Sequence, residues 1–164
     1  MYANEAMTPN TVTCKPDSDL EGIARMMWEW DCGAIVVVDN DNKAIGIVTD
    51  RDIAMAAMLN HKPLWEIHAS TIIEHQTLCR AFQNTSLDDC LALMKEQEIR
   101  RLPVVNEDGV LAGILSMGDA IAFTSKKLGL SKTSKTVSYD QVIEMLKQVS
   151  AHHEVANHPV SVVS

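Results

Sequence analysis

Apolar and polar positions alternate along the chain in an order that occurs twice. Apolar residues recur at helical spacing within residues 20–30 and again within 87–94. Each helical stretch is followed by two short apolar runs of the kind found in buried strands. The runs cover residues 35–38, 44–48, 102–105 and 111–115.

The links between paired runs indicate hairpins. Residues 40–43 read Asn-Asp-Asn-Lys and residues 107–109 read Glu-Asp-Gly, which is turn chemistry. A further helix is expected after each hairpin, at about 50–59 and 117–128. A short extended segment is expected before each first helix, at 11–13 and 78–80. Ser18 with Glu21, and Thr85 with Asp88, are the expected helix caps.

These two patterns are copies of one unit. Gly46-Ile47-Val48-Thr49-Asp50-Arg51-Asp52 returns 67 positions later as Gly113-Ile114-Leu115-Ser116-Met117-Gly118-Asp119. The same shift aligns residues 20–52 without a gap and yields nine identities in 33 positions, where chance supplies about two. One unit of about 55 residues buries its apolar face poorly. We therefore predict an α/β (α+β) protein in which two units pack sheet against sheet about a pseudo-twofold axis.

The expected domain boundaries follow from this repeat. Residues 1–62 form the first unit with an N-terminal segment, 63–127 a linker and the second unit, and 128–164 a polar linker, an amphipathic helix and a tail. The helix begins at Ser138, with Gln141 three residues later, and is expected either to pack on the units or to exchange with a partner subunit.

Charge and composition narrow the class of function. The chain has 164 residues and a formal charge of −8, which disfavours general binding to nucleic acid or an anionic membrane. No apolar run is long enough to span a bilayer, and the N-terminus lacks the features of a secretory signal. We expect a cytoplasmic protein whose four cysteines are reduced and mostly buried. No metal site is expected, because clustered ligands are absent.

The repeated Gly-x-x-Thr/Ser-x-x-Asp segment has two interpretations. Thr49 and Ser116 stand where a strand ends and a helix begins, and free backbone N–H groups there favour an anion. Asp52 and Asp119 follow in the first helical turn, where a carboxylate can accept two hydrogen bonds from the vicinal diol of a ribose. The pair therefore indicates either a nucleotide site or plain helix capping. The preceding glycine indicates close approach of a ligand or of another backbone.

The repeated unit resembles the CBS domain, a small sensory unit named after cystathionine beta-synthase. The resemblance rests on Pro16-Asp17-Ser18-Asp19-Leu20, on Ile99-Arg100-Arg101-Leu102-Pro103-Val104-Val105 and on the two repeated segments, and it covers residues 8–127. It implies a tandem pair that binds an adenosine-containing ligand. In that family the aspartate binds the ribose, the Thr/Ser contacts the phosphate, and the base lies between the first extended segment and the first hairpin strand.

Carried over residue by residue, the resemblance implies two unequal sites. The first has Thr49, Arg51 and Asp52, with Thr11, Val12, Gly33 and Ala34 around the base; the second has Ser116 and Asp119, with Leu78, Cys79, Arg101, Leu102 and Pro103. Because Gly118 replaces the cation of Arg51, we expect the first site to bind phosphate better. Alternatively, the side chains of Arg100 and Arg101 point across the pseudo-twofold axis into the first site.

The resulting hypothesis is a regulatory module and not an enzyme. It binds AMP, ADP or ATP as a regulatory ligand, forms a homodimer and signals to an effector protein in trans. Alternatives are a sensor of NAD or S-adenosylmethionine, and a structural oligomerisation module with degenerate pockets. A further alternative is an enzyme with a metal site at His152, His153 and His158. The sequence contains no P-loop, GxSxG, HExxH or dinucleotide fingerprint.

Overall fold

The computed structural model describes residues 1–120, 122 and 143–146. The helices are α1 (Ala3–Ala6), α2 (Leu20–Glu29), α3 (Asp50–Asn60), the 3-10 turn η1 (Leu64–Glu66), α4 (Ala69–Ile73) and α5 (Leu87–Glu96). The strands are β1 (Thr8–Pro9), β2 (Thr13–Cys14), β3 (Ala34–Val38), β4 (Ala44–Thr49), β5 (Ala81–Phe82), β6 (Arg101–Val105) and β7 (Leu111–Ser116).

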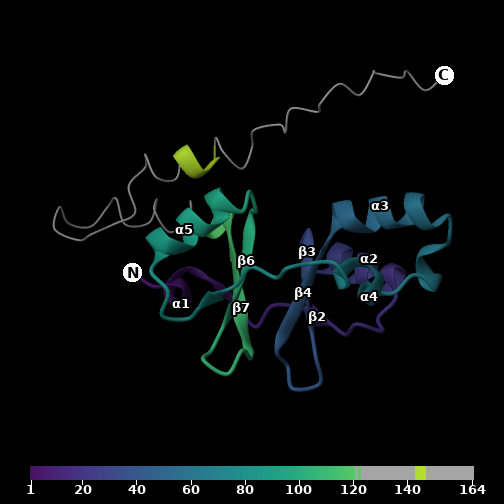
Figure 1. Ribbon diagram of the computed structural model, residues 1–164, viewed down its shortest axis with the longest axis horizontal. Coiled ribbons are helices and arrows are strands. Elements are labelled where there is room, and N and C mark those ends of the chain that lie inside the picture. Colours follow the sequence, from purple (N-terminus) through teal and green to yellow (C-terminus); the bar gives the residue numbers. More distant parts are fainter. Residues whose placement is uncertain (121, 123–142, 147–164) are drawn as a thin grey trace.

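Two small mixed sheets form the centre of the molecule. One has the order β2-β3-β4 and the other the order β1-β7-β6-β5. In each, a short strand pairs in parallel with the first hairpin strand, and the hairpin itself is antiparallel. Helices α2 and α3 lie on one outer side and α5 on the other (Figure 1). This arrangement confirms the expected α/β fold of two units facing each other through their sheets.

Contacts between the hairpins place the pseudo-twofold axis. Lys43 forms an isolated bridge with Val110, its own counterpart 67 positions later. On either side of this bridge the Leu111 N–H donates to the Asn42 carbonyl (3.0 Å) and the Ala44 N–H to the Gly109 carbonyl (3.3 Å). Residues 44 and 111 are equivalent in the repeat, and so are 42 and 109, so the two hydrogen bonds are related by the pseudo-twofold symmetry. The axis therefore passes close to Lys43 and Val110.

Each unit has an apolar core on the helical side of its sheet. The first core includes Leu20, Ile23, Ile35, Val37 and Val48, and the second includes Leu87, Met94, Leu102, Val104 and Leu115. A third, smaller cluster joins the inner faces of the two sheets. It contains Val36, Val38, Ala44 and Val105, with Leu78, Leu111 and Ile114 packed against it.

The segments that precede each unit are exchanged between the two sheets. Strand β1 pairs with β7 of the second unit, and Met1 accepts a hydrogen bond from the Leu87 N–H (2.9 Å). Correspondingly, α4 packs against β4 of the first unit, and Ile67 accepts one from the Leu20 N–H (2.9 Å). Residues 1–9 therefore pack on the second unit and α4 packs on the first, while the expected boundaries of the units along the chain, 1–62 and 63–127, stay a prediction.

This exchange explains the glycine of the repeated segment. A Cβ on Gly113 would lie 2.5 Å from the Thr8 carbonyl oxygen and 2.9 Å from Met7 Sδ, while one on Gly46 would lie 2.8 Å from Ile73 Cβ. Of the two expected reasons for a strand glycine, the structure shows close packing of the exchanged segments.

Replacing Gly113 with alanine is expected to lower the free energy of unfolding by about 1–3 kcal/mol, because the new methyl group must displace the β1 backbone. Urea denaturation measures this effect. The matched control is Gly22→Ala, whose Cβ would lie 3.6 Å from the nearest atom, Asp19 Oδ1, and which should cause no loss. Equal stabilities of the two variants would contradict the packing explanation.

Three local expectations need correction or completion. The helix caps lie one residue later than expected, at Asp19 and Ser86, whose side chains accept from the N–H groups of Gly22 and Asp89. The parallel strands β2 and β5 begin at Thr13 and Ala81, also later than the starts of the expected extended segments at 11–13 and 78–80. Of the C-terminal helix the structure describes 143–146, where Met145 is buried in the second core. The polar linker, the boundary at 127/128 and the tail histidines lie outside the described residues.

Candidate functional site

The two repeated aspartates close reciprocal capping boxes at the starts of their helices. Asp52 Oδ2 accepts from the Thr49 N–H (2.9 Å) and hydroxyl (2.7 Å), while the Asp52 N–H donates to Thr49 Oγ1 (3.2 Å). Asp119 and Ser116 repeat this arrangement at 2.7, 2.6 and 3.1 Å. The capping interpretation is thus confirmed as local geometry, and the second oxygen of each carboxylate decides what else it can bind.

The second oxygens differ between the two units. Asp119 Oδ1 accepts a hydrogen bond from the Thr8 hydroxyl (3.3 Å), whereas Asp52 Oδ1 takes none from the residues that the structure describes. Thr8 is not among the site residues expected from the sequence. The signal that identifies it is tertiary, because Thr8 reaches Asp119 only through the pairing of β1 with β7.

Strand register places the expected residues of β3, β4, β6 and β7, apart from Leu102, on the inner faces of the sheets. Thr49 pairs with Ala34, and Ser116 pairs with Arg101. Because side chains alternate along a strand, Ala34 lies on the same face as Val36, and Arg101 on that of Pro103 and Val105. Val36 and Val105 belong to the cluster between the sheets. Leu102 has the opposite orientation and is fully buried in the second core, away from this space.

Arg101 extends from the second unit to the first. Its Nη2 atom would be 3.1 Å from a Cβ built on Gly33, and Asp50 Oδ2 would be 3.3 Å from that same point. The guanidinium therefore lies at the start of β3 and close to the N-terminus of α3. Of the two directions left open for Arg101, the structure shows the one that crosses the pseudo-twofold axis. It adds a cation beside the first site, where Arg51 is exposed.

The remaining expected residues lie on the two segments that run between the sheets. Thr11 and Val12 are half-buried between β1 and β2, and Val12 packs on the first core. Leu78 and Cys79 are half-buried ahead of β5. Leu78 packs on the cluster between the sheets, and the Cys79 thiol donates to Gln97 Oε1 at 3.7 Å. Both segments are therefore within reach of both units.

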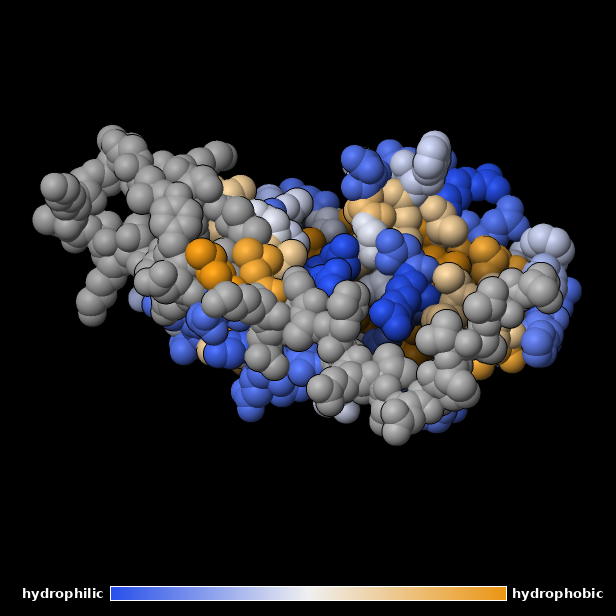
Figure 2. All heavy atoms as spheres, turned by 90° about the horizontal axis from the view of Figure 1, so that it is seen from above, coloured by the Kyte–Doolittle hydropathy of each residue, from blue (hydrophilic) through white to orange (hydrophobic). Residues whose placement is uncertain are grey.

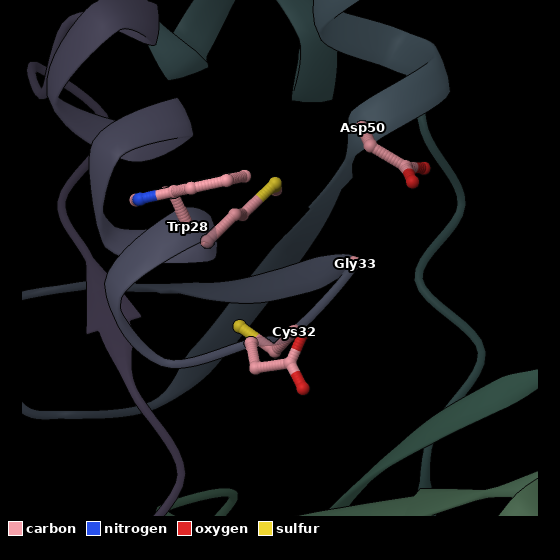
Figure 3. Close-up of a pocket in the computed structure, with 6 residues that line it drawn as sticks. Trp28, Cys32, Gly33 and Asp50 are labelled. Atoms are coloured by element: carbon pink, nitrogen blue, oxygen red, sulfur yellow. The ribbon is translucent and has the colours of Figure 1, made fainter.

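A cavity of about 450 Å³ lies on the helical side of the first unit. It is lined by Met27, Trp28, Asp31, Cys32, Gly33 and Asp50. Trp28 on α2 and Asp50 at the start of α3 lie on opposite sides of it (Figure 3). Of the expected site residues only Gly33 lines this cavity, and Asp52 is not part of its lining. A smaller cavity of about 280 Å³ extends it toward Ala24 and Ile53.

Two of the four cysteine thiols have pKa values above the ordinary value. Burial raises the pKa of Cys14 to about 11, and burial followed by the nearby charge of Asp89 raises the pKa of Cys90 to about 11. All four thiols are free. Within the described part of the chain, no group of three or more His, Cys, Asp or Glu side chains is placed to hold a metal ion. None of the described helices is long and apolar enough to cross a membrane.

Comparison with known proteins identifies the repeated unit. A family model described as CBS domain matches residues 3–59 and 81–126. YhcV of Bacillus subtilis, a CBS domain-containing protein, is 31% identical over 70% of this chain and 79% of its own length. Uncharacterized protein MK0525 of Methanopyrus kandleri is 30% identical over 71% of the chain. The chain spans 59% of MK0525 and 21% of the inosine-5'-monophosphate dehydrogenase of Bifidobacterium longum, which is 25% identical over 73% of this chain.

Solved structures with the same fold include ligand complexes. The crystal structure of CBSX2 in complex with AMP has a TM-score of 0.67 at 24% identity, covering 79% of this chain and 98% of that one. The CBS domain pair of MJ0100, in complex with 5-methylthioadenosine and S-adenosyl-L-methionine, has a TM-score of 0.66 at 21% identity, covering 77% and 98%.

Proposed function

The chain belongs to the CBS domain family, and from this premise we propose that it is a regulatory module that binds an adenosine-containing ligand and signals to a partner in trans. The ligand is an adenine nucleotide, AMP, ADP or ATP. It lies between the two units, with its ribose at Asp52 in the first site and at Asp119 in the second.

The observation that carries this proposal is the state of Asp52. Its carboxylate lies in the first turn of α3, and its Oδ1 accepts no hydrogen bond from the described residues. A carboxylate oxygen with two free lone pairs accepts both hydroxyls of a diol. The positive end of the α3 dipole, together with Arg51 and the guanidinium of Arg101 near Gly33, supplies positive potential for a phosphate.

The choice of ligand follows from these groups. A ribose and a phosphate are common to AMP, ADP and ATP, whereas S-adenosylmethionine has a cationic sulfonium in place of the phosphate. Arginines near the site favour the nucleotides over that cation. The AMP complex of CBSX2 agrees with this preference, while the MJ0100 complex shows that the same fold also holds sulfur-containing adenosines.

A homodimer is part of the proposal. The first unit exposes large apolar side chains on and beside α2, α3 and η1, among them Trp28 (88% exposed), Trp30, Met55, Met58, Leu59 and Trp65. Figure 2 shows apolar residues gathered over the side of the first unit. Contiguous apolar surface of this kind marks an interaction site. In the second unit, Met145 of the C-terminal segment is buried against the core.

A structural oligomerisation module is the second candidate. It is favoured by the capping boxes, which occupy Oδ2 of both aspartates, and by the lining of the larger cavity, which includes neither of these aspartates. In that case the exposed helical face is the functional surface and no nucleotide is bound.

Native mass spectrometry of the full chain purified from cells separates the two candidates. The sensor predicts a dimer that carries adenosine-containing ligands, with a mass increase that disappears after exhaustive dialysis. AMP added at 100 times its dissociation constant should then stabilise the protein by about 2.7 kcal/mol in thermal unfolding. A ligand-free dimer that shows no thermal shift with AMP, ADP, ATP, NAD or S-adenosylmethionine would favour the structural module.

A further inference from the structure

The carboxylates of the two repeated segments, Asp52 and Asp119, differ in their free acceptor positions. In each aspartate, Oδ2 already accepts two hydrogen bonds from the capping box. Each Oδ1 has two lone pairs of its own. At Asp119 one of these lone pairs accepts from the Thr8 hydroxyl (3.3 Å), so one remains. At Asp52 the described residues leave both available.

The fold holds Thr8 next to Asp119. Thr8 pairs with Ile114 and Pro9 with Gly113 in the antiparallel ladder between β1 and β7. The preceding helix α1 is fixed to the second unit, since the Ala3 N–H donates to the Thr85 carbonyl (2.9 Å) and Ala3 is fully buried. Because Gly113 has no side chain, the β1 backbone can lie directly against β7. The contact to Asp119 is therefore a consequence of the exchanged N-terminal segment.

The corresponding place in the first unit has a different structure. There the side chain of Gln76 replaces the strand: its Oε1 accepts from the Ile47 N–H (3.3 Å) and its Nε2 donates to the Ile47 carbonyl (3.0 Å). The neighbouring residues are Glu74 and His75, both exposed. Neither donates a hydrogen bond to Asp52 within the described part of the chain.

We propose that Thr8 adds to the inequality of the two sites, by occupying an acceptor position of Asp119 that the diol of a ribose needs. This inference rests on the proposed function. A diol has two hydroxyl donors. Asp52 Oδ1 offers them two acceptor positions, whereas Asp119 Oδ1 offers one as long as it accepts from the Thr8 hydroxyl. The first site therefore fills at lower ligand concentration, and Thr8 is a specificity-determining residue of the second site.

Titration calorimetry of the full chain with AMP tests this assignment. Thr8→Val removes the hydroxyl at nearly constant volume and is expected to raise the affinity of the weaker site about three- to tenfold, which corresponds to about 0.7–1.4 kcal/mol. Thr8→Ser keeps the hydroxyl and should behave as the unchanged chain. Thr8→Ala replaces Thr8→Val if the latter does not fold. The stronger site should keep its affinity in every variant.

A second probe, 2′-deoxy-AMP, has one diol donor fewer. In the unchanged chain it should lose less affinity at the second site than at the first, and Thr8→Val should remove this difference. The inference is overturned if AMP binds the first site normally while Thr8→Val leaves the second unchanged, or if Thr8→Val and Thr8→Ser have equal effects. Absence of AMP binding at both sites of the unchanged chain would instead overturn the proposed function, and the inference with it.

Discussion

Replacing Asp52 with alanine is expected to weaken AMP binding at the first site about ten- to hundredfold. The substitution removes a charged acceptor for the ribose hydroxyls, and a hydrogen bond to a charged group contributes about 1.5–3 kcal/mol. Titration calorimetry of the full chain with AMP measures the loss. The effect should fall on the first site alone, because Asp119 belongs to the other unit and lies in the helical turn of residues 117–120.

The control for this experiment must reproduce the loss of a helix cap. Asp52 closes a capping box, so Asp52→Ala also removes contacts of α3 with Thr49. Asp89 makes the same kind of contact on α5, where its Oδ2 accepts from the Ser86 hydroxyl (2.6 Å) and its N–H donates to Ser86 Oγ (3.1 Å). Asp89→Ala should lower stability by a similar amount, about 1 kcal/mol, without changing AMP affinity. Equal loss of affinity in the two variants would refute the ribose role of Asp52.

Leu102→Ala is expected to lower the free energy of unfolding by about 2–5 kcal/mol, because the side chain is fully buried in the second core and its removal leaves a cavity. The same variant should bind AMP with unchanged affinity while it is folded. Both quantities come from one preparation, by urea denaturation and by titration calorimetry in the absence of urea.

Arg101→Ala is the matched comparison, since Arg101 precedes Leu102 in β6 and points to the opposite face of the sheet. It should change stability little and weaken AMP binding, because Arg101 is half-buried and its guanidinium lies beside Gly33 of the first unit. If Leu102→Ala weakened AMP binding more than Arg101→Ala at equal folded fraction, the family-derived expectation that Leu102 contacts the base would be restored.

Local patterns were sufficient for the elements that contain them. The helix α3, the two hairpins and the duplication are all visible in residues 20–60 and their counterparts, because spacing and turn chemistry act over a few positions. Asn42 and Gly109, which correspond to each other, both adopt positive φ angles (62° and 83°) at the expected turns. The Thr49–Asp52 and Ser116–Asp119 pairs likewise follow from sequence alone, since a capping box spans three residues.

No sequence pattern predicted the segments that are exchanged between the two sheets, α1 with β1 and α4. Helices α1 and α4 have four and five residues, and β1 has two, so none carries a period that a sequence reading can detect. Their positions depend on which sheet edge and which helix start remain open after the two units have packed. The caps show the same limit on a smaller scale, because Ser18 and Asp19 are adjacent and the chain geometry selects Asp19.

The sequence by itself determined the repeat, the order of its elements and the two carboxylates at the helix starts, because these depend on neighbours a few residues apart. The tertiary structure alone decided that Arg101 crosses to the first unit, that Leu102 faces a core and that Thr8 reaches Asp119. Those contacts join residues far apart in the chain, 111 positions for Thr8 and Asp119, and they exist only once the two sheets face each other.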